Sequence, residues 1–176
     1  MRTLGPGSVS SFLKVILDVV YAALWIASGA VALALLGVLL FSFNPAFLNN
    51  ITIINDGRDA PLNPRMVGAG LAAAGLYLGG VLAIVDRLRR IFMTLTAGDP
   101  FHPDNVARLR LIGALLGGLE ILRYAVWSLS AWLMPAIDRR DVNLNLTAWF
   151  SVLVIFVLAE VFREGARLRR EAELTI

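Results

Sequence analysis

Four long apolar blocks, separated by short charged segments, constrain the fold of this chain more than any other feature of its sequence. They run at about residues 12–43, 66–84, 111–134 and 148–161. A helix needs about 20 apolar residues to cross a hydrocarbon core of about 30 Å. The first and third blocks reach this length directly, the second when Leu88 is included, and the fourth when it extends from Leu144 to Phe162. The blocks therefore predict an integral membrane protein.

The composition fits a chain that lies mostly in lipid. Charged residues make up 16% of the 176 residues, whereas soluble domains hold about 25%. Little chain remains for a separate soluble domain, so we predict one all-α membrane domain over residues 1–176. Its bundle of four transmembrane helices is expected at about 12–43, 66–88, 111–134 and 146–162.

The basic residues lie mostly on one side of the predicted membrane. The side with both termini holds Arg2, Lys14, Arg87, Arg89, Arg90, Arg108, Arg110, Arg163, Arg167, Arg169 and Arg170, and the other side holds Arg58, Arg65, Arg139 and Arg140. Cytoplasmic loops carry the excess of Lys and Arg in membrane proteins. We therefore predict a multi-pass membrane protein, in contact with lipid, with both termini and the middle loop in the cytoplasm.

The charged segments on this side continue the helical pattern of the spans. Apolar residues recur at helical spacing from Leu88 to Leu95, with arginines on the other faces. Gly98 is a typical helix stop, and a turn follows it. We expect two helical projections into the cytoplasm, a hairpin over about 86–110 and a tail over 163–176.

Small residues recur along one face of the second span and one face of the third. They are Gly68, Ala72, Gly75 and Gly79 in the second span, and Gly113 and Gly117 in the third. Small residues allow membrane helices to approach closely. Two interpretations stay open: packing of helices within the chain, or formation of a homo-oligomer through one of these faces.

Two ionisable residues, Glu120 and Arg123, lie inside the third span. They fall roughly ten residues into the helix, about 15 Å along its axis. A lone charge at such a depth is costly, but the i, i+3 spacing allows these two side chains to form an ion pair. The pair either fixes helix packing or forms a site that senses a proton or a ligand.

Motifs typical of catalytic sites are missing from the sequence. His102 is the single histidine and cysteine is absent, so no usual zinc site can form. The sequence contains no phosphate-binding loop and no nucleophile elbow. We therefore predict that the protein is not an enzyme, has no catalytic, cofactor or metal site, and makes no direct contact with nucleic acid. A small oligomeric transporter or channel remains as an alternative function.

Two segments resemble a known family of proteins. In that family a Gly-x-Pro-Phe turn is followed by Asn and an Arg-rich start of the third helix, matched here by Gly98, Pro100, Phe101, Asn105 and Arg108. The family also ends in a charged helix and a Leu-Thr-Ile/Val terminus, matched by Leu174, Thr175 and Ile176. Both segments resemble a bacterial family of small four-helix membrane proteins of unknown function, which implies a location in the bacterial inner membrane.

The resemblance implies a partner protein. Members of this family are often encoded beside a Cro/CI-like helix-turn-helix regulator, which implies a regulatory or sensing membrane protein that tethers this cytoplasmic transcription factor. The hairpin and the tail would then form one docking surface. Its candidate contacts are Arg87, Arg90, Phe101, Arg108, Arg167 and Leu174. The other interpretation is that these residues only anchor helix ends at the lipid surface.

Overall fold

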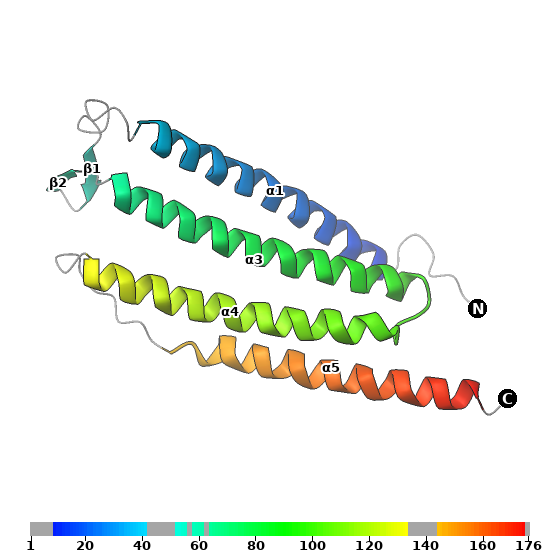
Figure 1. Ribbon diagram of the computed structural model, residues 1–176. Coiled ribbons are helices and arrows are strands. Elements are labelled where there is room, and N and C mark those ends of the chain that lie inside the picture. The colour runs from blue at the N-terminus through cyan, green and yellow to red at the C-terminus, as the bar shows by residue number, and fades with distance from the viewer. Residues whose placement is uncertain (1–8, 42–51, 56–57, 62–63, 134–143, 175–176) are drawn as a thin grey trace. The chain divides into compact units, whose positions relative to one another are not determined.

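Four long helices and one short β-hairpin make up the described chain (Figure 1). The computed structural model describes residues 9–41, 52–55, 58–61, 64–133 and 144–174. The helices are α1 (Val9–Phe41), α3 (Pro64–Thr96), α4 (Pro103–Leu133) and α5 (Leu146–Glu173). The predicted all-α membrane fold is confirmed.

The β-hairpin is an addition that the apolar pattern did not predict. Its strands are β1 (Thr52–Asn55) and β2 (Arg58–Pro61), which lie in the connection from α1 to α3. They pair antiparallel, in a register that runs from Thr52 opposite Pro61 to Asn55 opposite Arg58. Four-residue strands are too short to show a clear alternating pattern, so a sequence of this length carries little signal for them.

Three of the described helices are long and apolar enough to cross a membrane. They cover Phe12–Phe41, Met66–Thr96 and Leu146–Ala172. The remaining predicted span, 111–134, falls largely on α4, a helix of 31 residues with Glu120 and Arg123 near its middle. α4 is not among the helices that meet this criterion of length and hydropathy, so the fourth span stays a prediction. The protein is therefore a membrane protein with long helices as its main structural elements.

The helices are longer than a membrane requires. α1 and α3 contain 33 residues each, which corresponds to about 50 Å, against a hydrocarbon core of about 30 Å. As the sequence predicts, α3 continues through its charged segment to Thr96 without a break. α5 continues in the same way through its charged segment to Glu173. The charged segments are thus direct extensions of apolar helices.

The turn between α3 and α4 is built around Gly98, which has φ +83°. This left-handed conformation is easily adopted only by glycine. The amides of Gly98 and Asp99 donate to the carbonyls of Leu95 and Thr94, at 3.1 Å and 3.0 Å. These bonds satisfy carbonyl groups that the end of α3 leaves without helical partners.

The next helix starts with a proline in its first turn, where the missing N–H costs nothing. α4 begins at Pro103, and the His102 side chain accepts a hydrogen bond from the Asp104 amide at 3.2 Å. Asp104 places a negative charge at the positive end of the helix dipole. Local signals therefore define both sides of the turn.

Contacts divide the chain into two compact units. One unit is Ala23–Gly79, where α1 and α3 approach each other at small residues. A Cβ atom at Gly68 would lie 3.8 Å from the Val38 side chain, and one at Gly75 would lie 3.7 Å from Val31. The other unit combines Met1–Ala22 with Gly80–Ile176 and contains the candidate site.

Candidate functional site

The candidate site is the region where the charged ends of three helices meet. We call it the charged head, and define it as residues 86–96 of α3, the turn 97–102, residues 103–110 of α4 and residues 160–174 at the end of α5. The predicted hairpin and residues 163–174 of the predicted tail fall within it, and residues 175–176 of the tail lie outside the described residues. The structure thus brings together two segments that lie about 60 residues apart in the sequence.

An apolar core joins the three helices of the head to one another. Its buried members are Ile91, Leu109, Ile112 and Ala159, one or two from each helix. Partly buried residues that surround them are Ile84, Leu88, Leu95, Leu116, Ile155 and Phe162. The apolar stripe that the sequence predicts along the end of α3 therefore faces this core. Burial of such side chains is the main source of stability in water.

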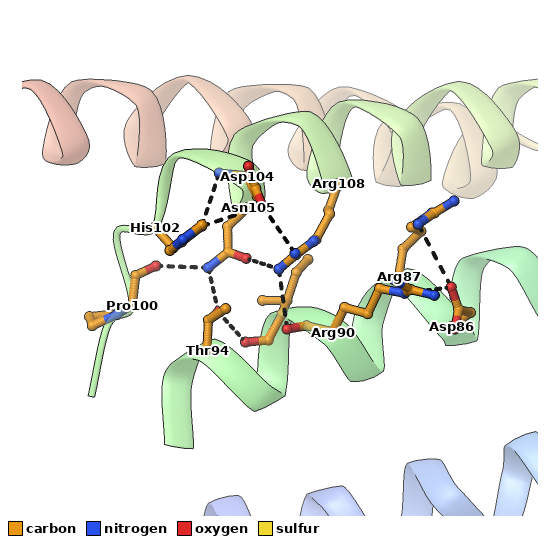
Figure 2. A network of polar contacts seen from close by, with 10 residues as sticks. Asp86, Arg87, Arg90, Thr94, Pro100, His102, Asp104, Asn105 and Arg108 are labelled. Carbon is orange, nitrogen blue, oxygen red and sulfur yellow. Dashed lines mark hydrogen bonds and ion pairs between the residues drawn. The ribbon is translucent and has the colours of Figure 1, made fainter. Parts of the chain in front are cut away.

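A buried asparagine, Asn105, connects α3, the turn and α4 (Figure 2). Its side chain is 0% exposed. Its Nδ2 donates to the Thr94 hydroxyl at 2.7 Å and to the Pro100 carbonyl at 3.1 Å. Its Oδ1 accepts from Arg108 at 2.9 Å. Because both ends of the amide are satisfied, this polar group can be buried at little cost.

Two of the predicted docking arginines are parts of this internal network. Arg108 donates to the Arg90 carbonyl at 3.3 Å and to the Asp104 carboxylate at 3.4 Å, in addition to its bond to Asn105 (Figure 2). The Arg90 side chain donates to Asp86 at 2.9 Å. Arg87 lies 3.8 Å from the same carboxylate. Arg108 therefore links α4 to α3, whereas the Arg87 and Arg90 side chains contact Asp86 on their own helix.

The tip of the hairpin contacts α5 through one aromatic ring and one ion pair. The Phe101 ring lies 5.7 Å from the Phe162 ring, centre to centre, at an angle of 52°. It also covers Gly165, where a Cβ atom would lie only 2.5 Å from a carbon of the ring. Asp99 is bridged to Arg169. We call these five residues the clasp, since they connect the turn to α5.

A small open pocket of about 170 Å³ lies beside the clasp. It is lined by Asp99, Phe101, Pro103, Ala166, Arg169 and Arg170. Residues of the turn, the start of α4 and the end of α5 thus form one concave surface. None of the sequence patterns predicted this pocket, because it depends on how the turn packs against α5.

The other two predicted docking residues, Arg167 and Leu174, lie on α5 and directly after it. Arg167 pairs with Glu164 at 2.7 Å and with Glu171 at 3.4 Å, both on its own helix. Leu174 follows α5 and is 87% exposed. Leu174 is therefore an apolar side chain with almost no cover from the described residues.

An ion pair between α1 and α3 was missed by the sequence reasoning. Arg89 donates to Asp18 at 2.7 Å through Nε and lies 2.6 Å away through Nη2. Its guanidinium also lies 4.2 Å from the centre of the Tyr21 ring. The spacing of these residues gave no signal, since 71 positions separate the two charges.

Glu120 and Arg123 form the predicted ion pair on α4. Arg123 donates from Nε and Nη2 to the two carboxylate oxygens, at 3.1 Å and 2.5 Å. Glu120 is buried, whereas the Arg123 side chain is 40% exposed and lies 4.6 Å from the Tyr124 ring centre. The Tyr124 hydroxyl accepts from the backbone of Asn145, the N-cap of α5. A polar cluster therefore extends along α4 to the start of α5.

The small residues of α3 and α4 differ in what they face. A Cβ atom at Gly113 would lie 3.0 Å from the Phe156 ring of α5. A Cβ atom at Gly79 or Gly117 would have no neighbouring heavy atom within 4 Å. Ala72 is exposed. Gly80 of α3, which the sequence analysis did not single out, packs more closely than these glycines. A Cβ atom at Gly80 would lie 2.6 Å from the Leu119 side chain of α4. Close packing thus occurs at some glycines and not at others.

Comparison with known proteins places the chain in a family. No curated protein and no solved structure matches it. One family model, described as "Protein of unknown function (DUF2975)", matches residues 57–176. This match covers more than half of the chain and includes α3, α4, α5 and the whole charged head. The expected membership of an uncharacterised family is confirmed. The chain belongs to the DUF2975 family.

Proposed function

We propose that this protein is a non-enzymatic anchor in the bacterial inner membrane, with its charged head in the cytoplasm, and that the head binds and retains a soluble helix-turn-helix regulator. The observation that carries the proposal is the construction of the head. It combines a core from three helices with a buried polar network and a clasp. Such a rigid surface is suited to recognition of another protein.

The reach of the head supports a soluble partner. The uncharged stretches end at Asp86 in α3 and at Glu160 in α5. Beyond these residues α3 continues for about 15 Å and α5 for about 20 Å. The headgroup layer adds only about 5–8 Å to each side of the hydrocarbon core. If the hydrocarbon ends where the uncharged stretches end, the tip of the head lies in water.

The pairing of charges in the head supports a protein partner over lipid or nucleic acid. Acidic side chains accompany most of its arginines: Arg87 and Arg90 with Asp86, Arg108 with Asp104, Arg110 and Arg163 with Glu160, Arg167 with Glu164, and Arg169 with Asp99. Binding to phosphates depends on unneutralised Lys and Arg. A surface of mixed charges is less suited to that role and compatible with a protein interface.

The candidate contacts divide into two groups on this view. Arg108 is a positioning residue of the hairpin and Phe101 belongs to the clasp, whereas Arg87 and Arg90 pair with Asp86 on the surface of α3. Leu174 is the candidate with the largest uncovered apolar surface. We therefore expect the regulator to bind mainly along the α5 side of the head.

Substitution Leu174→Ala tests this proposal. Truncation of a leucine side chain that is covered by a partner loses about 1 kcal/mol or more of apolar burial. Retention of the regulator should therefore fall about five- to tenfold. The measurement is a pull-down of the tagged protein from native membranes in mild detergent, with the co-purified helix-turn-helix protein quantified by mass spectrometry. Leu144→Ala is the matched control, because Leu144 is also exposed but precedes the opposite end of α5.

Either of two results would contradict the proposal. Absence of a helix-turn-helix protein from the wild-type pull-down would remove the regulator as partner. Equal loss with Leu144→Ala and Leu174→Ala would show that the effect does not come from the head. Phe101→Ala is less informative, since the ring also packs against Phe162 and its loss would disturb the clasp.

A small oligomeric transporter or channel is the second candidate function. The observation that favours it is the Glu120–Arg123 pair, whose arginine is 40% exposed within a predicted span. A partly exposed charge in a membrane helix usually faces a water-filled path or another helix. On this view, Glu120→Gln should abolish flux of ions or protons into liposomes that contain the purified protein. Flux that is absent in the wild type would remove this candidate.

A further inference from the structure

We infer that the pocket beside the clasp binds an acidic side chain, next to an apolar one, on the soluble partner. This inference rests on the proposed function and specifies the chemistry of its contact. Three features of the described residues support it: a cavity lined by both apolar and polar groups, an arginine with unused donors, and a position far along α5.

The cavity has the size and lining for one side chain. Its volume of about 170 Å³ is smaller than the roughly 300–1,000 Å³ of typical cofactor and small-molecule sites. Phe101, Pro103 and Ala166 provide apolar atoms to the lining. Two of these residues come from the turn and α4, and one comes from α5, so the clasp must be closed for the cavity to exist.

Arg170 provides the polar group that sets the chemistry of the ligand. Its Nε donates to the Ala166 carbonyl at 3.3 Å, and among the described residues no carboxylate pairs with it. Arg169, in the same lining, is bridged to Asp99. A guanidinium offers five N–H donors in a planar fork that matches a carboxylate. The Nη groups of Arg170 can therefore bind an acidic side chain at the edge of the cavity.

The position of Arg170 favours a soluble ligand over a lipid headgroup. Arg170 follows Glu160 by ten residues, which corresponds to about 15 Å along α5. The headgroup layer extends only about 5–8 Å beyond the hydrocarbon core. A headgroup phosphate would thus lie short of the pocket, whereas a segment of a soluble protein reaches it directly. The ligand that fits is Asp or Glu beside an apolar side chain such as Leu or Phe.

The test measures the Kd between the full-length protein, in nanodiscs of zwitterionic phosphatidylcholine, and the purified helix-turn-helix regulator. Arg170→Gln removes the charge and the fork, so the Kd should rise about tenfold or more. Arg170→Lys retains the charge without the fork and should give an intermediate Kd. Arg163→Gln is the matched control, since it removes the same charge from an arginine of α5 that pairs with Glu160. Its Kd should stay within about twofold of the wild-type value.

The outcomes separate the inference from the proposed function. If the wild-type protein does not bind the regulator, the proposed function fails and the inference fails with it. If the wild type binds and Arg170→Gln leaves the Kd unchanged, only the inference is overturned. The inference is also overturned by a second result, in which Arg170→Gln leaves the Kd unchanged but lowers the amount of bound lipid. This amount is measured by native mass spectrometry of the protein in discs that contain phosphatidylglycerol. That result would identify the pocket as a lipid site. Equal thermal midpoints for all variants establish that each one is folded.

Discussion

Replacement of Asn105 by alanine is expected to destabilise the charged head by about 2–3 kcal/mol. The Asn105 side chain is fully buried and makes hydrogen bonds at both ends of its amide. Without it, the Pro100 carbonyl and the Thr94 hydroxyl each lose a donor. A buried polar group without a partner costs about 1–3 kcal/mol. Arg108 keeps two other acceptors and contributes less to the loss.

Limited proteolysis of the protein in detergent micelles measures this effect locally. The hairpin of Asn105→Ala should be cleaved between α3 and α4 much faster than that of the wild type, because cleavage follows the population of the open form. Thr96→Val is the control, since the Thr96 hydroxyl is exposed and bonds only to carbonyls of its own helix. Equal cleavage rates for Asn105→Ala and the wild type would show that the asparagine does not hold the turn.

The second large effect is expected for Gly165→Ala, at about 1–3 kcal/mol. The new methyl carbon would lie 2.5 Å from the Phe101 ring, which is much closer than atoms in contact can approach. The ring must therefore move away from α5, and its tilted contact with the Phe162 ring would weaken. The clasp should then open, and both the fluorescence of a probe on the turn and the rate of proteolysis should change.

Two comparison variants make the Gly165 prediction specific. Gly118→Ala should be neutral or stabilise α4 by up to about 1 kcal/mol, because nothing lies within 4 Å of its Cβ position and alanine favours helices. In the double variant Gly165→Ala with Phe101→Ala, the second change should cost less than Phe101→Ala alone, since the methyl group occupies part of the vacated space. Strictly additive losses would contradict a direct clash.

The elements of the head could be predicted because their signals are local. The apolar spacing from Leu88 to Leu95 faces the core of the head, as expected. Gly98 ends the first helix of the hairpin with the positive φ that its residue type permits. Outside the head, the i, i+3 spacing of Glu120 and Arg123 also predicted the ion pair that α4 contains. Each of these features depends on residues only a few positions apart.

The roles of individual side chains in the head could not be predicted in the same way. Arg108 was selected as a surface contact, yet it donates to Asn105 and to the Arg90 carbonyl within the hairpin. The GxxxG spacing indicated Gly113, which packs closely against Phe156, but it also suggested Gly79 and Gly117, which have no neighbour within 4 Å. It missed the close approach at Gly80 and Gly165. Spacing along one helix indicates a face, but the neighbour of that face comes from another part of the chain.

The sequence by itself determined that this protein is a set of long apolar helices with charged extensions, because hydrophobic length, helix stops and caps act within one or two turns. Only the tertiary structure decided how the extensions work together. Contacts such as Phe101 on Gly165, or Asp99 with Arg169, join residues more than 60 positions apart. Such contacts depend on the packing of α3, α4 and α5 around a shared core, and no local pattern in the chain specifies them.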